Sequence, residues 1–301
     1  MITIRIKHTC LLFLMLSHIG LAQVETPNTQ PYTIQSTFEK LVKTYPDILP
    51  IEELKSDNIA SDEHIIYQKN DNVTLQADVY YPKTPNQKYP AVILVHGGGW
   101  MSGSKENQRV MAQHLAKNGF VAMTVNYRLA NEAKYPAAVE DLNTAIDFLH
   151  DSNYPVDTNQ LAILGASAGA QLATLVGMKH QKIKAIINID GIVSFIHPEA
   201  EEGQYAAFWL SGNKAENFNI WKEASPLEHI HPQSPAILFI NSSQPRFHAG
   251  RDDLIKKYND WNIYNETHTL PNSPHSFWLV HPWFQPTLHY IVEFLNNIFK
   301  Q

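Results

Sequence analysis

Hydrophobic and polar positions follow two distinct rhythms along most of this chain. Short apolar runs, typical of strands buried on both faces, are separated by stretches in which apolar residues return every three or four positions, as on one helix face. The pattern predicts strands at 64–69, 73–81, 91–95, 121–126, 161–164, 183–189, 235–240 and 266–270, and helices at 106–118, 137–151, 167–178, 252–261 and 286–299.

This alternation of strands and helices predicts an α/β domain over residues 61–301. Its sheet should be mostly parallel, with eight strands and helices on both faces. The first two strands are joined by the turn-forming residues Asn-Asp-Asn at 70–72 and should form a hairpin.

One segment, residues 194–225, interrupts the rhythm and is rich in aromatic side chains. We expect a small cap insertion above the strand ends, where open α/β sheets bind ligands. A packed excursion with its own small core is an equally good interpretation, and the two are compatible.

The N-terminal residues differ from the rest of the chain. Residues 1–22 combine a basic start, a short apolar run at 11–16 and small residues before Gln23, which predicts a secretory signal peptide. The run is shorter than the ~20 apolar residues of a membrane-spanning helix. We therefore expect an exported protein, periplasmic or secreted. Residues 23–60 are polar, contain several prolines and hold one amphipathic stretch at 38–45, which predicts an N-terminal arm packed on the domain.

Composition and charge exclude several classes of protein. Apolar residues make up 44% of the 301 residues and charged residues 17%, as in ordinary globular proteins. The net charge of -6 and the lack of a basic stripe argue against a nucleic-acid partner. The single cysteine, Cys10, lies in the predicted leader, so the mature chain would have no disulfide, cysteine nucleophile or thiolate metal site.

Residues 165–169 read Gly-Ala-Ser-Ala-Gly and follow the predicted strand 161–164. A serine on a sharp strand-to-helix turn has a strained backbone, so its neighbours must be small, and its hydroxyl is lifted clear of the sheet. The following helix directs its positive N-terminal end at the site. Glycine and serine often meet in ordinary turns, but this context favours Ser167 as a nucleophile.

A glycine-rich segment follows the strand 91–95, where residues 96–100 read His-Gly-Gly-Gly-Trp. Glycines allow successive amides to turn toward one point, where the oxyanion of an acyl-transfer intermediate would form. We expect the amides of Gly98, Gly99 and Ala168 to make this oxyanion hole. His96 is expected to brace the loop. A phosphate cradle is disfavoured because no Gly-Lys-Ser/Thr follows.

Together these motifs make the chain resemble the α/β-hydrolase superfamily. Within it, the chain is most similar to carboxylesterases related to hormone-sensitive lipase and to bacterial feruloyl and acetyl-xylan esterases. The resemblance covers about 64–301 and includes Asn-Tyr-Arg-Leu at 126–129, Tyr-Pro-Ala-Ala at 135–138, Asp141, and Ala-Ser-Pro-Leu at 224–227. It implies an α/β-hydrolase fold, a serine esterase that needs no cofactor or metal, and structural roles for Tyr135 and Asp141.

The resemblance also places a catalytic base after the last strand. His275 occupies that position, and an imidazole has the pKa needed to carry the serine proton. His281 is a rival six residues later, but it stands nearer the closing helix, so we prefer His275.

The acid of the triad is where the sequence departs from the family pattern, which puts an Asp soon after the seventh strand. No carboxylate follows that strand until Asp252 and Asp253. Asp252 lies in the correct loop, but it can equally cap the next helix. Asp190 ends the sixth strand, where some lipases of this fold carry the acid, but it can equally be a buried Asp bonded to loop amides. Asp190 and Asp252 stay open as alternatives, with Asp253 behind them.

Other residues near the predicted site suggest substrate contacts. Trp100, Trp209 and Trp278 are candidates for stacking on sugar rings, although core packing takes most tryptophans.

Three basic residues, Arg246, His248 and Arg251, occupy the loop after the seventh strand. They could contact an anionic sugar such as a uronate. Pairing with Asp252, Asp253 or the arm is the favoured interpretation.

The predicted reaction is ester hydrolysis through an acyl-enzyme. The expected substrates are acetyl or feruloyl esters of polysaccharides or oligosaccharides. A lipase or a peptidase of the same fold is an alternative, although residues 201–204, Glu-Glu-Gly-Gln, are less apolar than a lipase lid. The displaced acid also keeps open a catalytically impaired carbohydrate-binding relative. We expect no nucleic-acid partner and, after leader cleavage, no membrane partner.

Overall fold

The computed structural model describes residues 25–70, 72–84, 86–201 and 203–299. The predicted signal peptide, 1–22, and the middle residue of the predicted 70–72 turn lie outside the described residues. Within the described ranges, no helix combines the length and the apolar character needed to cross a bilayer.

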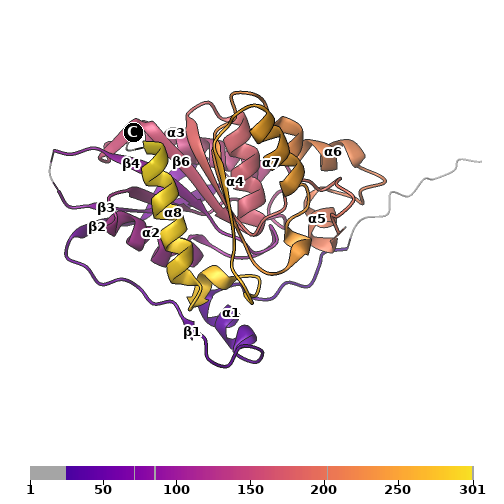
Figure 1. Cartoon of the computed structure of the whole chain (residues 1–301), viewed down its shortest axis with the longest axis horizontal. Helices are drawn as coiled ribbons and strands as arrows, with labels where there is room; N and C mark the ends of the chain where they lie inside the picture. Colours follow the sequence, from indigo (N-terminus) through magenta and orange to yellow (C-terminus); the bar gives the residue numbers. More distant parts are fainter. Residues whose placement is uncertain (1–24, 71, 85, 202, 300–301) are drawn as a thin grey trace, which may run out of the picture.

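An eight-stranded sheet forms the centre of the molecule (Figure 1), in the order β2-β3-β5-β4-β6-β7-β8-β9. β2 and β3 form an antiparallel hairpin, β3 pairs antiparallel with β5, and every later pairing is parallel. This confirms the predicted mostly parallel sheet. The strands are β2 (Ile59–Lys69), β3 (Thr74–Pro82), β4 (Tyr89–Val95), β5 (Val121–Val125), β6 (Val156–Ala166), β7 (Ile183–Ile189), β8 (Ala236–Asn241) and β9 (Asn265–Thr269).

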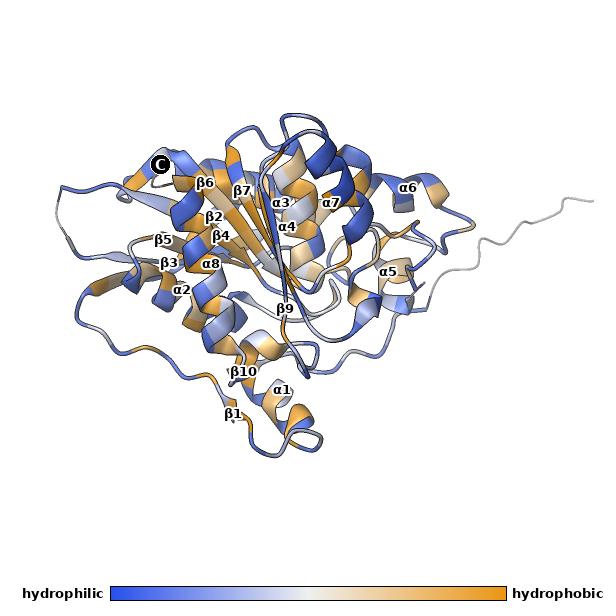
Figure 2. Cartoon of the chain, in the orientation of Figure 1, coloured by the Kyte–Doolittle hydropathy of each residue, from blue (hydrophilic) through white to orange (hydrophobic). Residues whose placement is uncertain are grey.

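Helices cover both faces of the sheet, as predicted. One hydrophobic core lies under α2 (Arg109–Lys117) and α8 (Phe284–Phe299), and the other lies under α3 (Ala137–His150), α4 (Ala168–Lys179) and α7 (Arg251–Asp260). Side chains of β4 alternate between the two cores, because successive residues of a strand point to opposite faces. Figure 2 shows the result as strands in the hydrophobic colours between helices whose outer faces are hydrophilic.

The N-terminal arm runs along the domain and is tied to it at several points. It contains α1 (Ile34–Leu41) and β1 (Leu49–Pro50), and β1 pairs with β10 (Val280–His281) near the C-terminus. The helix begins four residues before the amphipathic stretch noted at 38–45. The reason is a reciprocal cap, in which the Thr33 and Ser36 side chains each accept the other's backbone N–H.

The 194–225 segment holds two short helices, α5 (Gln204–Trp209) and α6 (Phe218–Glu223). Its Trp209 and Trp221 are fully buried and belong to the core under α4. Among its described residues, the insertion is therefore packed into the domain core and forms no separate core of its own.

Candidate active site

Ser167 sits on the turn between β6 and α4 with a positive φ of 55° and ψ of -122°. A β-carbon on Gly165 would lie 2.0 Å from the Gly169 carbonyl oxygen, and one on Gly169 would lie 2.4 Å from the Val95 oxygen. Only small residues can flank the serine, because the turn is packed directly against neighbouring backbone.

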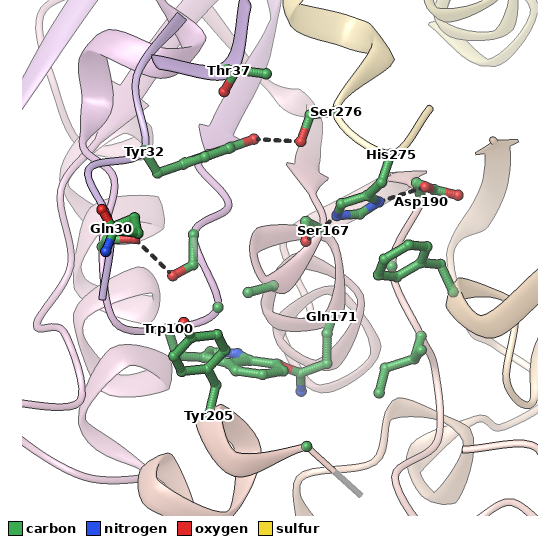
Figure 3. Close-up of a pocket in the computed structure, with 18 of the residues that line it drawn as sticks. Gln30, Tyr32, Thr37, Trp100, Ser167, Gln171, Asp190, Tyr205, His275 and Ser276 are labelled. Atoms are coloured by element: carbon green, nitrogen blue, oxygen red, sulfur yellow. Dashed lines mark hydrogen bonds and ion pairs between the residues drawn. The ribbon is translucent and has the colours of Figure 1, made fainter. Parts of the chain in front are cut away.

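Three side chains from three separate strand ends meet at this turn (Figure 3). His275, after β9, lies between the other two, with its Nε2 2.8 Å from Ser167 Oγ and its Nδ1 2.6 Å from Asp190 Oδ2. With the carboxylate accepting from Nδ1–H, Nε2 is left to accept the serine proton. The arrangement has the geometry of a nucleophile, a base and an orienting acid.

The Asp190 carboxylate is completely buried and follows β7 with a φ of 53°. Its Oδ1 accepts a hydrogen bond of 2.8 Å from the Ser242 amide, and His248 Nε2 lies 3.8 Å from the same oxygen, beyond hydrogen-bond distance. Burial works against ionisation, but the imidazoles of His248 and His275 and the Ser242 amide outweigh it and hold the pKa of Asp190 below its ordinary value. The group is therefore an anion in the folded protein.

The other acid candidates lie elsewhere. Asp252 is exposed in the first turn of α7 and bonds Arg251 Nε at 2.8 Å, while Asp253 Oδ2 lies 3.4 Å from His197 Nε2. His281, the rival base, belongs to β10 and pairs with Leu49 of the arm. The structure therefore brings Asp190 to His275.

Gly98, Gly99 and Ala168 line the same cavity as Ser167. Gly98 and Gly99 have φ values of 117° and 61°, which favour glycine, and a β-carbon on Gly98 would lie 2.0 Å from the Ser102 carbonyl oxygen. Within the described ranges, the amides of Gly98, Gly99 and Ala168 donate to no backbone carbonyl. They are therefore available to an oxygen on a bound ligand.

His96 lies beneath this loop and does not contact the serine. Its Nδ1 is 2.7 Å from the Gly97 carbonyl oxygen, its ring stacks on Tyr127, and the Tyr127 hydroxyl donates to the His96 carbonyl at 3.0 Å. Burial lowers its pKa to about 4, so the ring is neutral at pH 7. These contacts give His96 a bracing role.

The two residues to which the family resemblance gave structural roles are both held within the fold. The buried Asp141 accepts bonds of 2.8 Å and 2.9 Å from the Arg128 backbone and side chain, which ties α3 to the loop after β5. The Tyr135 amide donates to the Trp209 carbonyl at 3.1 Å, which fixes the cap to the domain.

A cavity of about 630 Å³ opens in front of Ser167 and His275, and Trp100 lines it. Trp209 and Trp278 do not line it, so their predicted role in stacking on sugars is wrong. Both side chains are buried, and each packs against another residue of the site. Trp209 stacks beneath Trp100 at 5.0 Å, and Trp278 packs edge-on to His275 at 5.2 Å.

Residues of the arm also line the cavity, which sequence reasoning missed. Tyr32 is the best placed, with its hydroxyl 3.4 Å from Ser276 Oγ and its carbonyl accepting from Asn107 Nδ2 at 3.1 Å. Burial raises the pKa of Tyr32 to about 12, so it is neutral. No sequence signal connects Tyr32 with a residue 244 positions later.

Among the residues that the structure describes, no three His, Cys, Asp or Glu side chains are grouped so that they could hold a metal ion.

Comparison with known proteins gives one family match and several relatives. The model of the BD-FAE family matches residues 77–247. Esterase LipC of Mycobacterium tuberculosis is 24% identical over 249 residues, which cover 72% of this chain and 60% of that protein. The match covers less than two thirds of the length of LipC and of other curated relatives. For two of these others, it covers 20% and 41% of the relative's own length.

Two solved structures illustrate the likeness of fold. A truncated carbohydrate esterase from gut microbiota has a TM-score of 0.67 and 19% identity, covering 81% of this chain and all of that one. An esterase from the archaeon Pyrobaculum calidifontis has a TM-score of 0.68 and 21% identity, covering 88% and 91%. These likenesses show the α/β-hydrolase fold.

Proposed function

The chain belongs to the BD-FAE family, and from this premise we propose that it is a serine carboxylesterase. The observation that carries the proposal is the position of His275, within hydrogen-bond distance of both Ser167 Oγ and the buried Asp190 carboxylate. The presence of esterases among its relatives supports the same activity.

In the proposed reaction, Ser167 Oγ attacks the ester carbonyl carbon while its proton passes to His275 Nε2. The amides of Gly98, Gly99 and Ala168 stabilise the oxyanion. The bond to the alcohol then breaks, and His275 gives the proton to the departing oxygen. Water gives a proton to His275 as its oxygen attacks the acyl-enzyme. The bond between the acyl carbon and Ser167 Oγ then breaks, the proton returns to Oγ, and the acid is released. Throughout, Asp190 keeps the proton on Nδ1 and stabilises the imidazolium.

We further propose that the natural substrates are acetyl or feruloyl esters of polysaccharides or oligosaccharides. Two features support this class. The gut-microbiota protein of the same fold is a carbohydrate esterase, and Trp100 offers an aromatic surface in a cavity large enough for a sugar ring. Release of acetate from acetylated xylan, or of ferulate from feruloylated sugars, tests the class directly.

Hydrolysis of 4-nitrophenyl acetate tests the activity itself. We expect Ser167→Ala to lower kcat/KM at least about 10⁴-fold, because the nucleophile is lost. Ser61→Ala, an exposed serine of β2, serves as the matched control and should keep full activity. Activity retained by Ser167→Ala would overturn the mechanism.

We also propose that the protein is exported, because of the leader-like residues 1–22. Cleavage before Gln23 should be visible in the mass of the mature protein recovered outside the cytoplasm. Recovery of the full-length chain in the cytoplasm alone would contradict this proposal.

A further inference from the structure

The cavity has two chemically different sides. The proposed mechanism requires the alcohol part of the ester to lie on one side and the acyl part on the other. His275 must give its proton to the departing alcohol, so the alcohol lies on the His275 side of Ser167. Figure 3 places Tyr32, Ser276 and His275 on that side, and Trp100, Gln171 and Tyr205 on the other. The first group therefore faces the alcohol and the second the acyl group.

Arg246 reaches the base only through the ring of Phe247, and on this ground we assign it to the His275 side of the cavity. It belongs to the short helix η3 (Pro245–Phe247), and its guanidinium lies 4.6 Å from the centre of the Phe247 ring. The same ring stacks on His275 at 3.6 Å. Arg246 lines the cavity and is exposed, and within the described ranges no carboxylate pairs with it.

The other two basic residues of this loop are held within the fold by other contacts. Arg251 bonds Asp252 at 2.8 Å and Asn241 at 2.8 Å, and His248 faces Asp190. The pairing favoured from the sequence, with Asp252, Asp253 or the arm, therefore holds for Arg251, whereas His248 lies near Asp190 and Arg246 has no such partner among the described residues.

The arm supplies a second cation to the same cavity. Lys40 lies one turn after Thr37 in α1, and Figure 3 shows Thr37 on the side of Ser276. Its exposed ammonium makes no ion pair with any described residue. The exposed carboxylate that lines the cavity, Glu201, belongs instead to the segment that leads into Tyr205 on the acyl side.

We propose that the alcohol side of the cavity binds an alcohol that carries a carboxylate, that is, the acylated hydroxyl of a sugar acid. Arg246 is the main contact, because its planar guanidinium can hold a carboxylate through two parallel hydrogen bonds. Lys40 adds a second positive charge. This inference rests on the proposed ester hydrolysis and narrows its substrate class.

A matched pair of substrates isolates the effect of the carboxylate. Methyl galacturonoside and methyl galactoside, each carrying one acetyl ester at the same hydroxyl, differ only in a carboxylate against a hydroxymethyl group. We expect kcat/KM for the galacturonoside to be about tenfold higher at low ionic strength. The preference should fall in about 0.5 M salt, because exposed charges are screened.

Variants then assign the preference to the two cations. Arg246→Gln should remove most of it, Arg246→Lys should keep part of it, and Lys40→Gln should reduce it about two- to threefold. Lys256→Gln, on the exposed surface of α7, is the matched control and should leave the preference unchanged. Lys256→Gln should also hydrolyse 4-nitrophenyl acetate at the wild-type rate. For the cavity variants the readout is the ratio of kcat/KM on the two sugars, in which any general change of activity cancels.

The outcomes separate this inference from the proposed function. Equal rates on the two sugars, or a preference that Arg246→Gln leaves intact, would overturn the inference while hydrolysis of the aryl ester still supports the esterase. Loss of all hydrolysis in the wild-type protein, aryl ester included, would instead overturn the proposed function.

Discussion

At the scale of single residues, the site depends on a carboxylate that stays ionised while it is fully buried. Asp190 achieves this because its two oxygens face two imidazoles and a backbone amide. An anion in this position fixes the His275 tautomer and compensates the charge that the ring acquires during reaction. The exposed Asp252 can neither fix the His275 tautomer nor compensate the charge on its ring.

Substitution of the two aspartates distinguishes their roles. Asp190→Asn should lower kcat for 4-nitrophenyl acetate by about 10³-fold or more, because an amide neither enforces the Nδ1–H tautomer nor balances the imidazolium charge. Asp252→Asn is the matched control and should change kcat by less than about twofold. A large loss in Asp252→Asn with little loss in Asp190→Asn would reverse the assignment.

The local strand-to-helix pattern was enough to predict Ser167, and His275 was predicted from the position that the family resemblance gives to the base. The acid could not be chosen in the same way. Asp190 and Asp252 both follow plausible strand ends, and only the packing of the four neighbouring strands β6 to β9 decides which carboxylate reaches the base. The buried roles of Trp209 and Trp278 depend on tertiary packing in the same manner.

At the scale of elements, the site is held by close backbone contact between β4, β6 and α4. Gly169 in the first turn of α4 lies against the carbonyl oxygens at the end of β4, which leaves no room for a β-carbon. This contact fixes the helix that carries the Ala168 amide next to the glycine-rich loop. The periodicity of the sequence predicted these elements well, but it gave no indication of this contact.

Gly169→Ala tests the contact. Although alanine is the better helix former, its β-carbon would lie 2.4 Å from the carbonyl oxygens of Val95 and His96. We expect the free energy of unfolding to fall by about 3 kcal/mol, measured by urea denaturation. Gly203→Ala, where nothing lies within 4 Å of the added carbon, is the control. Stability equal to wild type in Gly169→Ala would show that the contact is not tight.

The arm is the element that the sequence predicted least well. Its amphipathic residues indicated packing on the domain, but its helix begins at a cap that the hydrophobic pattern does not mark. Its path to the cavity depends on contacts such as Tyr32 with Ser276 and β1 with β10, which join distant parts of the chain. Contacts of this range leave no local pattern.

At the scale of the whole molecule, burial favours the neutral form of three histidines, the fully buried His96 and the partly buried His114 and His180. Burial lowers the pKa of His96 to about 4, and burial also lowers the pKa values of His114 and His180. Unfolding returns these rings to their ordinary pKa near 6.5. The unfolded chain therefore binds more protons than the folded protein between about pH 6.5 and pH 4, and folding stability rises with pH over that interval.

The free energy of unfolding should therefore be lower at pH 5 than at pH 7.5. His96 alone accounts for about 2 kcal/mol of this difference. The stabilisation from its neutral ring is fully present above pH 6.5 and is lost as the pH falls toward 4. Urea denaturation at the two pH values measures it. Equal or greater stability at pH 5 would contradict the neutral, buried state of these rings.

The most direct test of the central claim is covalent labelling with a fluorophosphonate, followed by peptide mass spectrometry. Such a probe reacts with a serine that is activated by a neighbouring base. We predict one adduct, on Ser167, that is absent in Ser167→Ala and forms far more slowly in His275→Ala. Failure of the wild-type protein to react, or an adduct on a different serine, would contradict the account of Ser167 as the nucleophile of an esterase.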